Sequence, residues 1–208
     1  DKVKVVIDSS VVEEGATDGE IIAYGPNVMK GYHNRPEDTK AALTPDGGFR
    51  TGDRGRLDKD GYLFITGRIK EQYKLENGKF CFPVSLEENI CLASFVQQAV
   101  VYGLNRPYNV CIVVPDFDVL LDYAKEKGLP TDIKTLVERE DIIHMISEAV
   151  TGQLKGKFGG YEIPKKFIIL PEAFSLDNGM LTQTMKLKRK VILDKLNDRI
   201  EALYKEDK

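Results

Sequence analysis

The chain has 208 residues and a formal net charge of −3, with 42% hydrophobic and 30% charged residues. This composition is typical of a globular protein and excludes a largely disordered chain, while the slightly negative charge disfavours a protein devoted to nucleic acids. The longest apolar runs, at 111–114 and 167–170, are far shorter than the roughly 20 residues that a helix needs to cross a bilayer.

Residues 1–68 are predicted to form a small β-rich unit. Apolar and β-branched runs indicate strands, and two Asp-Gly pairs each mark a tight turn that leads into a further strand. A short helix with Pro36 near its start interrupts them. The segments that carry these signals are the strands and turns at 3–8, 19–32, 44–49 and 58–67, and the helix at 35–43.

Residues 69–208 are predicted to form an α/β unit, so that the whole chain is α+β. Two nearly continuous apolar runs, at 97–104 and 109–116, are expected to be strands of a sheet that is covered on both faces. Ser85 and Glu88 are expected to form a capping box at the start of a helix. The other expected elements are a hairpin at 69–84, helices at 85–94, 116–128 and 134–156, a strand at 165–171 and a closing amphipathic helix at 186–206.

The Thr-Gly-Asp sequence at 51–53 provides the first candidate site residue. A carboxylate such as Asp53 suits the two hydroxyls of a ribose, because each of its oxygens can accept one hydroxyl proton. The alternative is an aspartate that only belongs to a polar turn, since turns often contain this residue. Arg68, at the end of the next expected strand, is either a surface ion-pair partner or a ligand for an anion.

Lys186 is the second candidate, because it follows two threonines in a non-helical stretch just before the closing helix. Its ammonium group is a compact charge that suits a phosphate or a carboxylate. The basic run at 188–190 is expected to be a solvated helix face, and in an acidic protein it gives weak support for nucleic-acid binding. His33 and His144 have no partners nearby in the sequence and are expected at the surface.

The three cysteines, at 81, 91 and 111, form no CxxC pair, so we expect no metal site and predict reduced thiols in the cytoplasm. The glycine-rich stretch at 152–162 lacks the GxxxxGK[ST] spacing and is expected to be a turn after a helix. The chain opens at Asp1 directly onto a β-like run without a signal peptide, so we expect a segment of a longer polypeptide.

Five motifs in order along the chain together resemble the adenylate-forming superfamily. Over nearly its whole length, the sequence is similar to the final third of the long-chain fatty acyl-CoA synthetases. Its lysine motif resembles the version found in that branch, where many other relatives carry Ser-Gly-Lys. The five motifs are GEIIAYGPNVMKGY at 19–32, GGFRTGD at 47–53, DGYLFITGR at 60–68, IKEQYKLENGK at 69–79 and LTQTMKLKR at 181–189.

The resemblance implies a reaction in which a fatty acid, ATP and CoA give acyl-CoA through an acyl-adenylate, with Mg²⁺ as a further cofactor. Thr51 and Asp53 would bind the nucleotide, with Asp53 on the 2′ and 3′ hydroxyls of the ribose. Arg68 would contact the ribose and its phosphate side. Lys186 would be the catalytic lysine, which contacts the substrate carboxylate and the α-phosphate during adenylation.

The resemblance also implies a division of labour between two parts of the chain. Residues 1–68 would end the large AMP-binding domain, and residues 69–208 would form a mobile lid with its hinge at Lys70, a position that is Asp or Lys in relatives. Lys74 and Gly78 would face the thiol half-reaction, and Gly78 would leave room for the pantetheine arm of CoA. The phosphate loop, the adenine pocket, the acyl tunnel and the Mg²⁺ ligands are expected upstream, so the chain alone is expected to be inactive.

Three other functions remain open. A fatty acyl-AMP ligase or an acyl–acyl carrier protein synthetase would share the same residues and differ in the acceptor. A non-catalytic binding or interaction module would not depend on Lys186 at all. Nucleic-acid binding through 186–190 would show a steep dependence on salt, but the net charge disfavours it. Because enzymes of long acyl chains often work at membrane surfaces, peripheral membrane contact of the complete enzyme is a further expectation.

Overall fold

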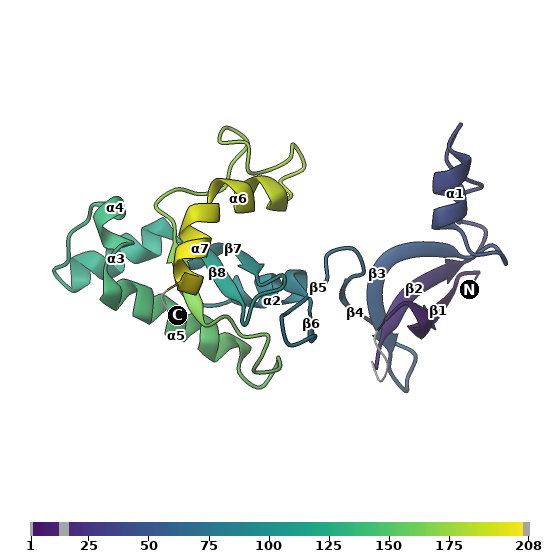
Figure 1. Cartoon of the computed structure of the whole chain (residues 1–208), viewed down its shortest axis with the longest axis horizontal. Coiled ribbons are helices and arrows are strands. Elements are labelled where there is room, and N and C mark those ends of the chain that lie inside the picture. Colours follow the sequence, from purple (N-terminus) through teal and green to yellow (C-terminus); the bar gives the residue numbers. More distant parts are fainter. Residues whose placement is uncertain (1, 13–16, 206–208) are drawn as a thin grey trace. The chain divides into compact units, whose positions relative to one another are not determined.

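The computed structural model describes residues 2–12 and 17–205. The chain divides into two compact units, Asp1–Gln72 and Tyr73–Lys208, and the colours of Figure 1 follow the chain through both. The boundary expected after residue 68 and this division fall at the same short turn, at 69–72. Sheets and helices occur together in the chain, so the predicted α+β class is confirmed.

The first unit contains a four-stranded antiparallel sheet with the strand order β1-β2-β3-β4. The turn between β3 and β4 forms because the Asp58 side chain accepts the N–H groups of Asp60 and Tyr62, each at 2.9 Å. The strands are β1 (Lys4–Asp8), β2 (Gly19–Tyr24), β3 (Phe49–Leu57) and β4 (Leu63–Arg68), accompanied by the 3-10 helix η1 (Ser9–Val11) and the helix α1 (Pro36–Ala42).

A β-bulge lies near the end of the β3–β4 ladder. The pairing shifts by one residue there and leaves Thr66 of β4 without an opposite residue on β3. Because of this extra residue Asp53 faces Arg68, whereas an unshifted ladder would place Gly67 opposite Asp53. The bulge therefore decides which side chain meets the Asp53 carboxylate.

The second unit is built on a three-stranded mixed sheet with the order β7-β8-β9, in which β7 and β8 are antiparallel and β8 and β9 parallel. Every residue of the central strand β8 is buried, which confirms the sheet covered on both faces. Cys111 and Val113 pack into one hydrophobic cluster, and Val110, Ile112 and Val114 pack into the other. The strands are β7 (Val96–Tyr102), β8 (Val110–Pro115) and β9 (Lys166–Ile169).

A small hairpin and six helices complete the second unit within the described residues. None of the helices in these ranges is long and apolar enough to cross a membrane. The hairpin strands are β5 (Tyr73–Lys74) and β6 (Phe80–Cys81), and the helices are α2 (Pro83–Ile90), α3 (Phe117–Glu126), α4 (Ile133–Leu136), α5 (Glu140–Leu154), α6 (Arg189–Lys195) and α7 (Asn197–Lys205).

The capping box predicted at Ser85 is wrong. Helix α2 begins two residues earlier, at Pro83, and Phe82 is its N-cap. Proline is favourable at the first helical position, because its fixed φ suits the helix and its missing N–H would have no partner there. Ser85 therefore lies inside the first turn, where its hydroxyl donates to the carbonyl of Phe82 at 3.2 Å.

Two helices predicted as continuous are each divided. The helix expected at 134–156 is α4 followed by α5, since Asp132 caps α4 and acidic residues open a second helix at Glu140. The closing helix breaks at Leu196, and this break lets both Ile192 and Ile200 pack into the same hydrophobic cluster. Residue 206, the expected last position of that helix, lies outside the described residues.

Candidate functional site

Asp53 and Arg68 lie opposite each other on β3 and β4, and Arg68 Nε is 3.1 Å from Asp53 Oδ1. The Asp53 side chain is 29% exposed and the Arg68 side chain is 55% exposed. An ion pair this exposed contributes little to stability, because water and salt screen it. The sheet therefore holds a carboxylate and a guanidinium side by side, where a polar ligand can reach both.

Thr51 and Gly52 fix the backbone next to Asp53. The Thr51 hydroxyl donates to the carbonyl of Ile21 at 2.8 Å and accepts the N–H of Asp53 at 3.0 Å. Gly52 has a φ of 72°, and its carbonyl accepts the N–H of Ile69 at 2.8 Å. A side chain at position 52 would be strained in this left-handed conformation, so the glycine is what allows this backbone geometry within β3.

Glu20 on β2 supports the same part of β3, and the sequence pattern did not single it out. It is 6% exposed, its Oε2 accepts from Arg50 Nη1 at 2.7 Å and its Oε1 accepts the N–H of Gly52 at 3.2 Å. A buried carboxylate is tolerated only with such partners. The available signal in the sequence was the acidic Glu20 directly before the apolar run at 21–24.

Asp18 holds the β-bulge. Its carboxylate accepts hydrogen bonds from the hydroxyl of the bulged Thr66 and from Nη2 of the buried Arg54, the latter at 2.6 Å. Burial alone would raise the pKa of Asp18, but the hydrogen bonds from Arg54 and Thr66 outweigh it and hold the pKa below its ordinary value of 3.8. The carboxylate therefore stays ionised and stabilises the register that pairs Asp53 with Arg68.

Lys186 lies in a turn between β9 and α6. The carbonyl of Lys186 accepts the N–H of Thr182 at 2.8 Å, and the N–H of Lys186 donates to the Thr182 hydroxyl at 3.1 Å. A β-bridge between Leu181 and Leu187 closes the base of this turn, which we call the lysine loop (181–187). The Lys186 side chain is exposed. The loop thus carries a positive charge on a short, closed turn.

The basic run after Lys186 is only partly the solvated helix face that its sequence predicts. Lys188 and Lys190 are exposed, but Arg189 binds the buried carboxylate of Glu87 through Nη1–Oε1 and Nη2–Oε2, each at 2.7 Å. The solvated-face prediction is therefore wrong for Arg189. The missed signal was Glu87, an acidic residue at a position where the helical period of α2 places apolar side chains.

Lys70, Lys74 and Gly78 all lie at or next to turns. Lys70 is exposed in the turn at 69–72. Lys74 is on β5, and its Nζ lies 4.7 Å from the centre of the Phe80 ring. Gly78, in the hairpin turn, has a φ of 80°, and a Cβ placed there would meet no described atom within 4 Å. The hairpin thus presents a cation beside an open backbone position.

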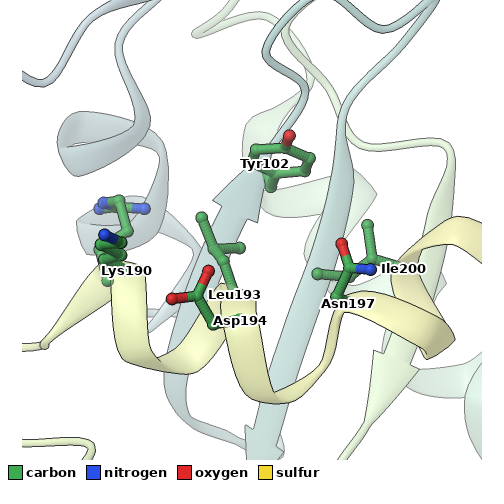
Figure 2. A pocket seen from close by; sticks show the side chains of 7 residues that line it. Tyr102, Lys190, Leu193, Asp194, Asn197 and Ile200 are labelled. Carbon is green, nitrogen blue, oxygen red and sulfur yellow. The ribbon is translucent and has the colours of Figure 1, made fainter.

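A cleft of about 440 Å³ lies beside α6 and the start of α7. Figure 2 shows its lining side chains, with Lys190, Leu193 and Asp194 on α6 and with Tyr102 at the end of β7. Arg189 also lines this cleft, which explains why its side chain keeps 26% exposure while that of Glu87 keeps only 8%. The ion pair is therefore open to solvent on its arginine side.

The predicted site residues fall into separate groups. The β3–β4 pair brings Thr51, Asp53 and Arg68 together in the first unit, and the other candidates lie on the turns and the lysine loop described above. Within the ranges that the structure describes, no three side chains of His, Cys, Asp or Glu lie close enough together to hold a metal ion.

Comparison with protein families defines the class of the chain. The family model of the AMP-binding enzyme C-terminal domain matches residues 70–208. The chain therefore belongs to this family.

Curated relatives are named as fatty acyl-CoA ligases. The chain is 37% identical to long-chain-fatty-acid–CoA ligase FadD15 of Mycobacterium tuberculosis, with 92% of this chain and 32% of that protein covered. It is 35% identical to human long-chain-fatty-acid–CoA ligase 1 (90% and 27%) and 33% identical to fatty acyl-CoA synthetase B of Dictyostelium discoideum (89% and 28%). The resemblance to this branch is confirmed, and the chain spans about a third or less of these relatives.

Solved structures of adenylate-forming enzymes share the fold. The adenylation domain of a carboxylate reductase from Mycobacterium chelonae has a TM-score of 0.77 at 26% identity, with 98% of this chain and 31% of that chain covered. MatB from Rhodopseudomonas palustris, solved with bound ATP, has a TM-score of 0.62 at 25% identity, with coverage of 95% and 35%.

Proposed function

We propose that the chain is part of an ATP-dependent long-chain fatty acid–CoA ligase, which converts a fatty acid, ATP and CoA into acyl-CoA, AMP and diphosphate through an acyl-adenylate. Its family membership and its 33–37% identity to long-chain ligases support this activity. In this proposal residues 1–68 end the large nucleotide-binding domain, and residues 69–208 form the mobile lid.

The pair of Asp53 and Arg68 is the observation that carries the proposal. The two oxygens of Asp53 accept hydrogen bonds from the 2′ and 3′ hydroxyls of the ATP ribose, beside the backbone that Thr51 holds. Arg68, whose Nε lies 3.1 Å from Asp53, contacts the ribose and the phosphate side of the same nucleotide. The β3–β4 bulge, the carboxylates of Asp18 and Glu20 and the left-handed Gly52 keep this exposed pair in place, which is more support than a surface ion pair needs for stability.

Lys186 supplies the charge for the first half-reaction. The fatty carboxylate attacks the α-phosphorus of ATP, and diphosphate leaves. Because the carboxylate is already ionised at neutral pH, no general base is needed. The Lys186 ammonium contacts the carboxylate and the α-phosphate, and it stabilises the charge that develops on the phosphoryl oxygens. Mg²⁺ bound to ATP would add to this stabilisation, and the resemblance to the family leads us to expect its protein ligands upstream of this segment.

The hairpin of the second unit serves the second half-reaction. Rotation of the lid about Lys70 withdraws Lys186 and brings Lys74 and Gly78 toward the acyl-adenylate. The open space at Gly78 then admits the pantetheine arm of CoA, whose thiol attacks the acyl carbon and releases AMP.

The proposed function is tested directly by identifying the molecule to which the complete ligase transfers the acyl group. Supplied with a long-chain fatty acid and ATP, the enzyme is expected to form acyl-CoA when CoA is present and to transfer no acyl group to acyl carrier protein. Mass spectrometry of the products measures both. Accumulation of acyl-adenylate despite CoA would identify a fatty acyl-AMP ligase instead, and transfer only to carrier protein would identify an acyl–acyl carrier protein synthetase. The 208-residue chain alone is expected to show no ATP–diphosphate exchange.

A further inference from the structure

The ion pair of Glu87 and Arg189 connects three separate segments of the second unit. Glu87 is on α2, Arg189 is the first residue of α6, and both also bind the backbone of Val101 on β7. The N–H of Val101 donates to Glu87 Oε1 at 2.7 Å, and the carbonyl of Val101 accepts from Arg189 Nη1 at 3.3 Å. β7 is an edge strand of its sheet, so its outer side has no neighbouring strand. The ion pair therefore binds the N–H and carbonyl of Val101 in the way that a further strand otherwise would.

Arg189 lies three residues beyond Lys186 and two residues after the end of the lysine loop. The N–H of Lys188 donates to the carbonyl of Met180 at 2.8 Å, which ties the end of the loop to its beginning. The loop is thus closed on itself, and its orientation depends on the attachment of its base to the rest of the unit. The buried side chain of Leu181 anchors the start of the loop, and the bidentate pair at Arg189 attaches its end, since a guanidinium bound at two points fixes direction as well as distance.

We propose that Glu87 and Arg189 are positioning residues that orient the lysine loop, so that the Lys186 ammonium is placed correctly for adenylation. This inference rests on the proposed function, because it assigns the pair a role through Lys186. Neither residue touches the substrate. A catalytic charge that is already in place avoids reorganisation during the reaction, and a misplacement of about 1 Å costs about 10²-fold in rate.

The test uses the complete ligase and three variants. The double variant Glu87→Gln/Arg189→Gln removes both charges of the ion pair. A single substitution would leave one buried charge unpaired and would strongly destabilise the fold. Arg189→Lys keeps the charge but loses the bidentate geometry. The matched control is Lys190→Gln, which removes the same charge one residue further along α6, from an exposed side chain to which no ion pair is assigned in the described part of the chain.

Each variant is measured in two separate half-reactions. Adenylation is followed by ATP–diphosphate exchange, and thiolysis by the reaction of preformed acyl-adenylate with CoA. The double variant is expected to lose about tenfold or more in kcat for adenylation and to stay within about twofold in thiolysis. Arg189→Lys is expected to lose less than the double variant, and Lys190→Gln to match the wild type in both half-reactions.

Combination with Lys186→Ala separates a positioning role from a general loss of stability. If the pair acts through Lys186, the double variant costs nothing further when Lys186 is already alanine. Equal losses in both half-reactions, additive losses with Lys186→Ala, or unchanged adenylation would each overturn this inference. The proposed role of Lys186 fails by a different result, namely unchanged adenylation in Lys186→Ala alone, and the proposed function fails if the wild-type enzyme forms no acyl-CoA.

Discussion

Replacing Lys186 by alanine is expected to reduce the kcat of adenylation by about 10²-fold or more, because the charge that develops on the α-phosphoryl oxygens loses its ammonium partner. The lysine loop keeps its hydrogen bonds in this variant, since they join the backbone of Lys186 to the backbone N–H and the hydroxyl of Thr182. The loss should therefore reflect the missing charge rather than a disturbed loop. ATP–diphosphate exchange with the complete ligase measures it.

The control for this prediction is Lys188→Ala, which removes an exposed lysine two residues away. It is expected to leave adenylation within about twofold of the wild type, because surface substitutions away from special contacts have small effects. Thiolysis of preformed acyl-adenylate should survive in Lys186→Ala, since the lysine is withdrawn in that step. Unchanged adenylation in Lys186→Ala would favour the non-catalytic binding module.

Replacing Asp53 by alanine is expected to raise the KM for ATP by about tenfold to a hundredfold. This change corresponds to the loss of about 1.5–3 kcal/mol of binding free energy, which is typical of hydrogen bonds to a charged group. The ribose hydroxyls take no part in the bond changes, so their contacts are the same in the ground state and the transition state. Loss of such uniform binding raises KM and leaves kcat nearly unchanged. Steady-state kinetics at varied ATP concentrations separate the two parameters.

The matched control is Asp60→Ala, in the turn between β3 and β4. Asp60 is exposed, and only its backbone N–H takes part in the hydrogen bonds of that turn. It should leave the KM for ATP unchanged. A fall in kcat with an unchanged KM in the Asp53 variant would contradict a role in binding the ribose. The thermal unfolding of the Asp53 variant should match the wild type, since the exposed pair with Arg68 adds little stability.

The sequence predicted those parts of the fold that depend on local patterns. The nearly continuous apolar run at 109–116 predicted a strand buried on both faces, and Asp-Gly marked the turn before β4. The sequence did not predict that the helices expected at 134–156 and 186–206 are each divided in two. Both halves of each pair pack on one core, so the helical spacing of apolar residues continues across the break and does not reveal it.

The support of the site could not be predicted, because its contacts join distant parts of the chain. Glu87 and Arg189 are 102 residues apart, and Glu20 and Arg50 are 30 residues apart, so no local pattern pairs them. The pairing of Asp53 with Arg68 depends on a bulge, and motif spacing alone does not reveal a one-residue shift in register.

A structure of the complete ligase with a bound acyl-adenylate analogue tests the central claim most directly. We expect both oxygens of Asp53 within about 3 Å of the 2′ and 3′ ribose hydroxyls, and the Lys186 ammonium against the α-phosphate of the same ligand. The claim is contradicted if Asp53 faces solvent while the ribose is bound elsewhere, and if Lys186 does not reach the nucleotide in any orientation of the lid.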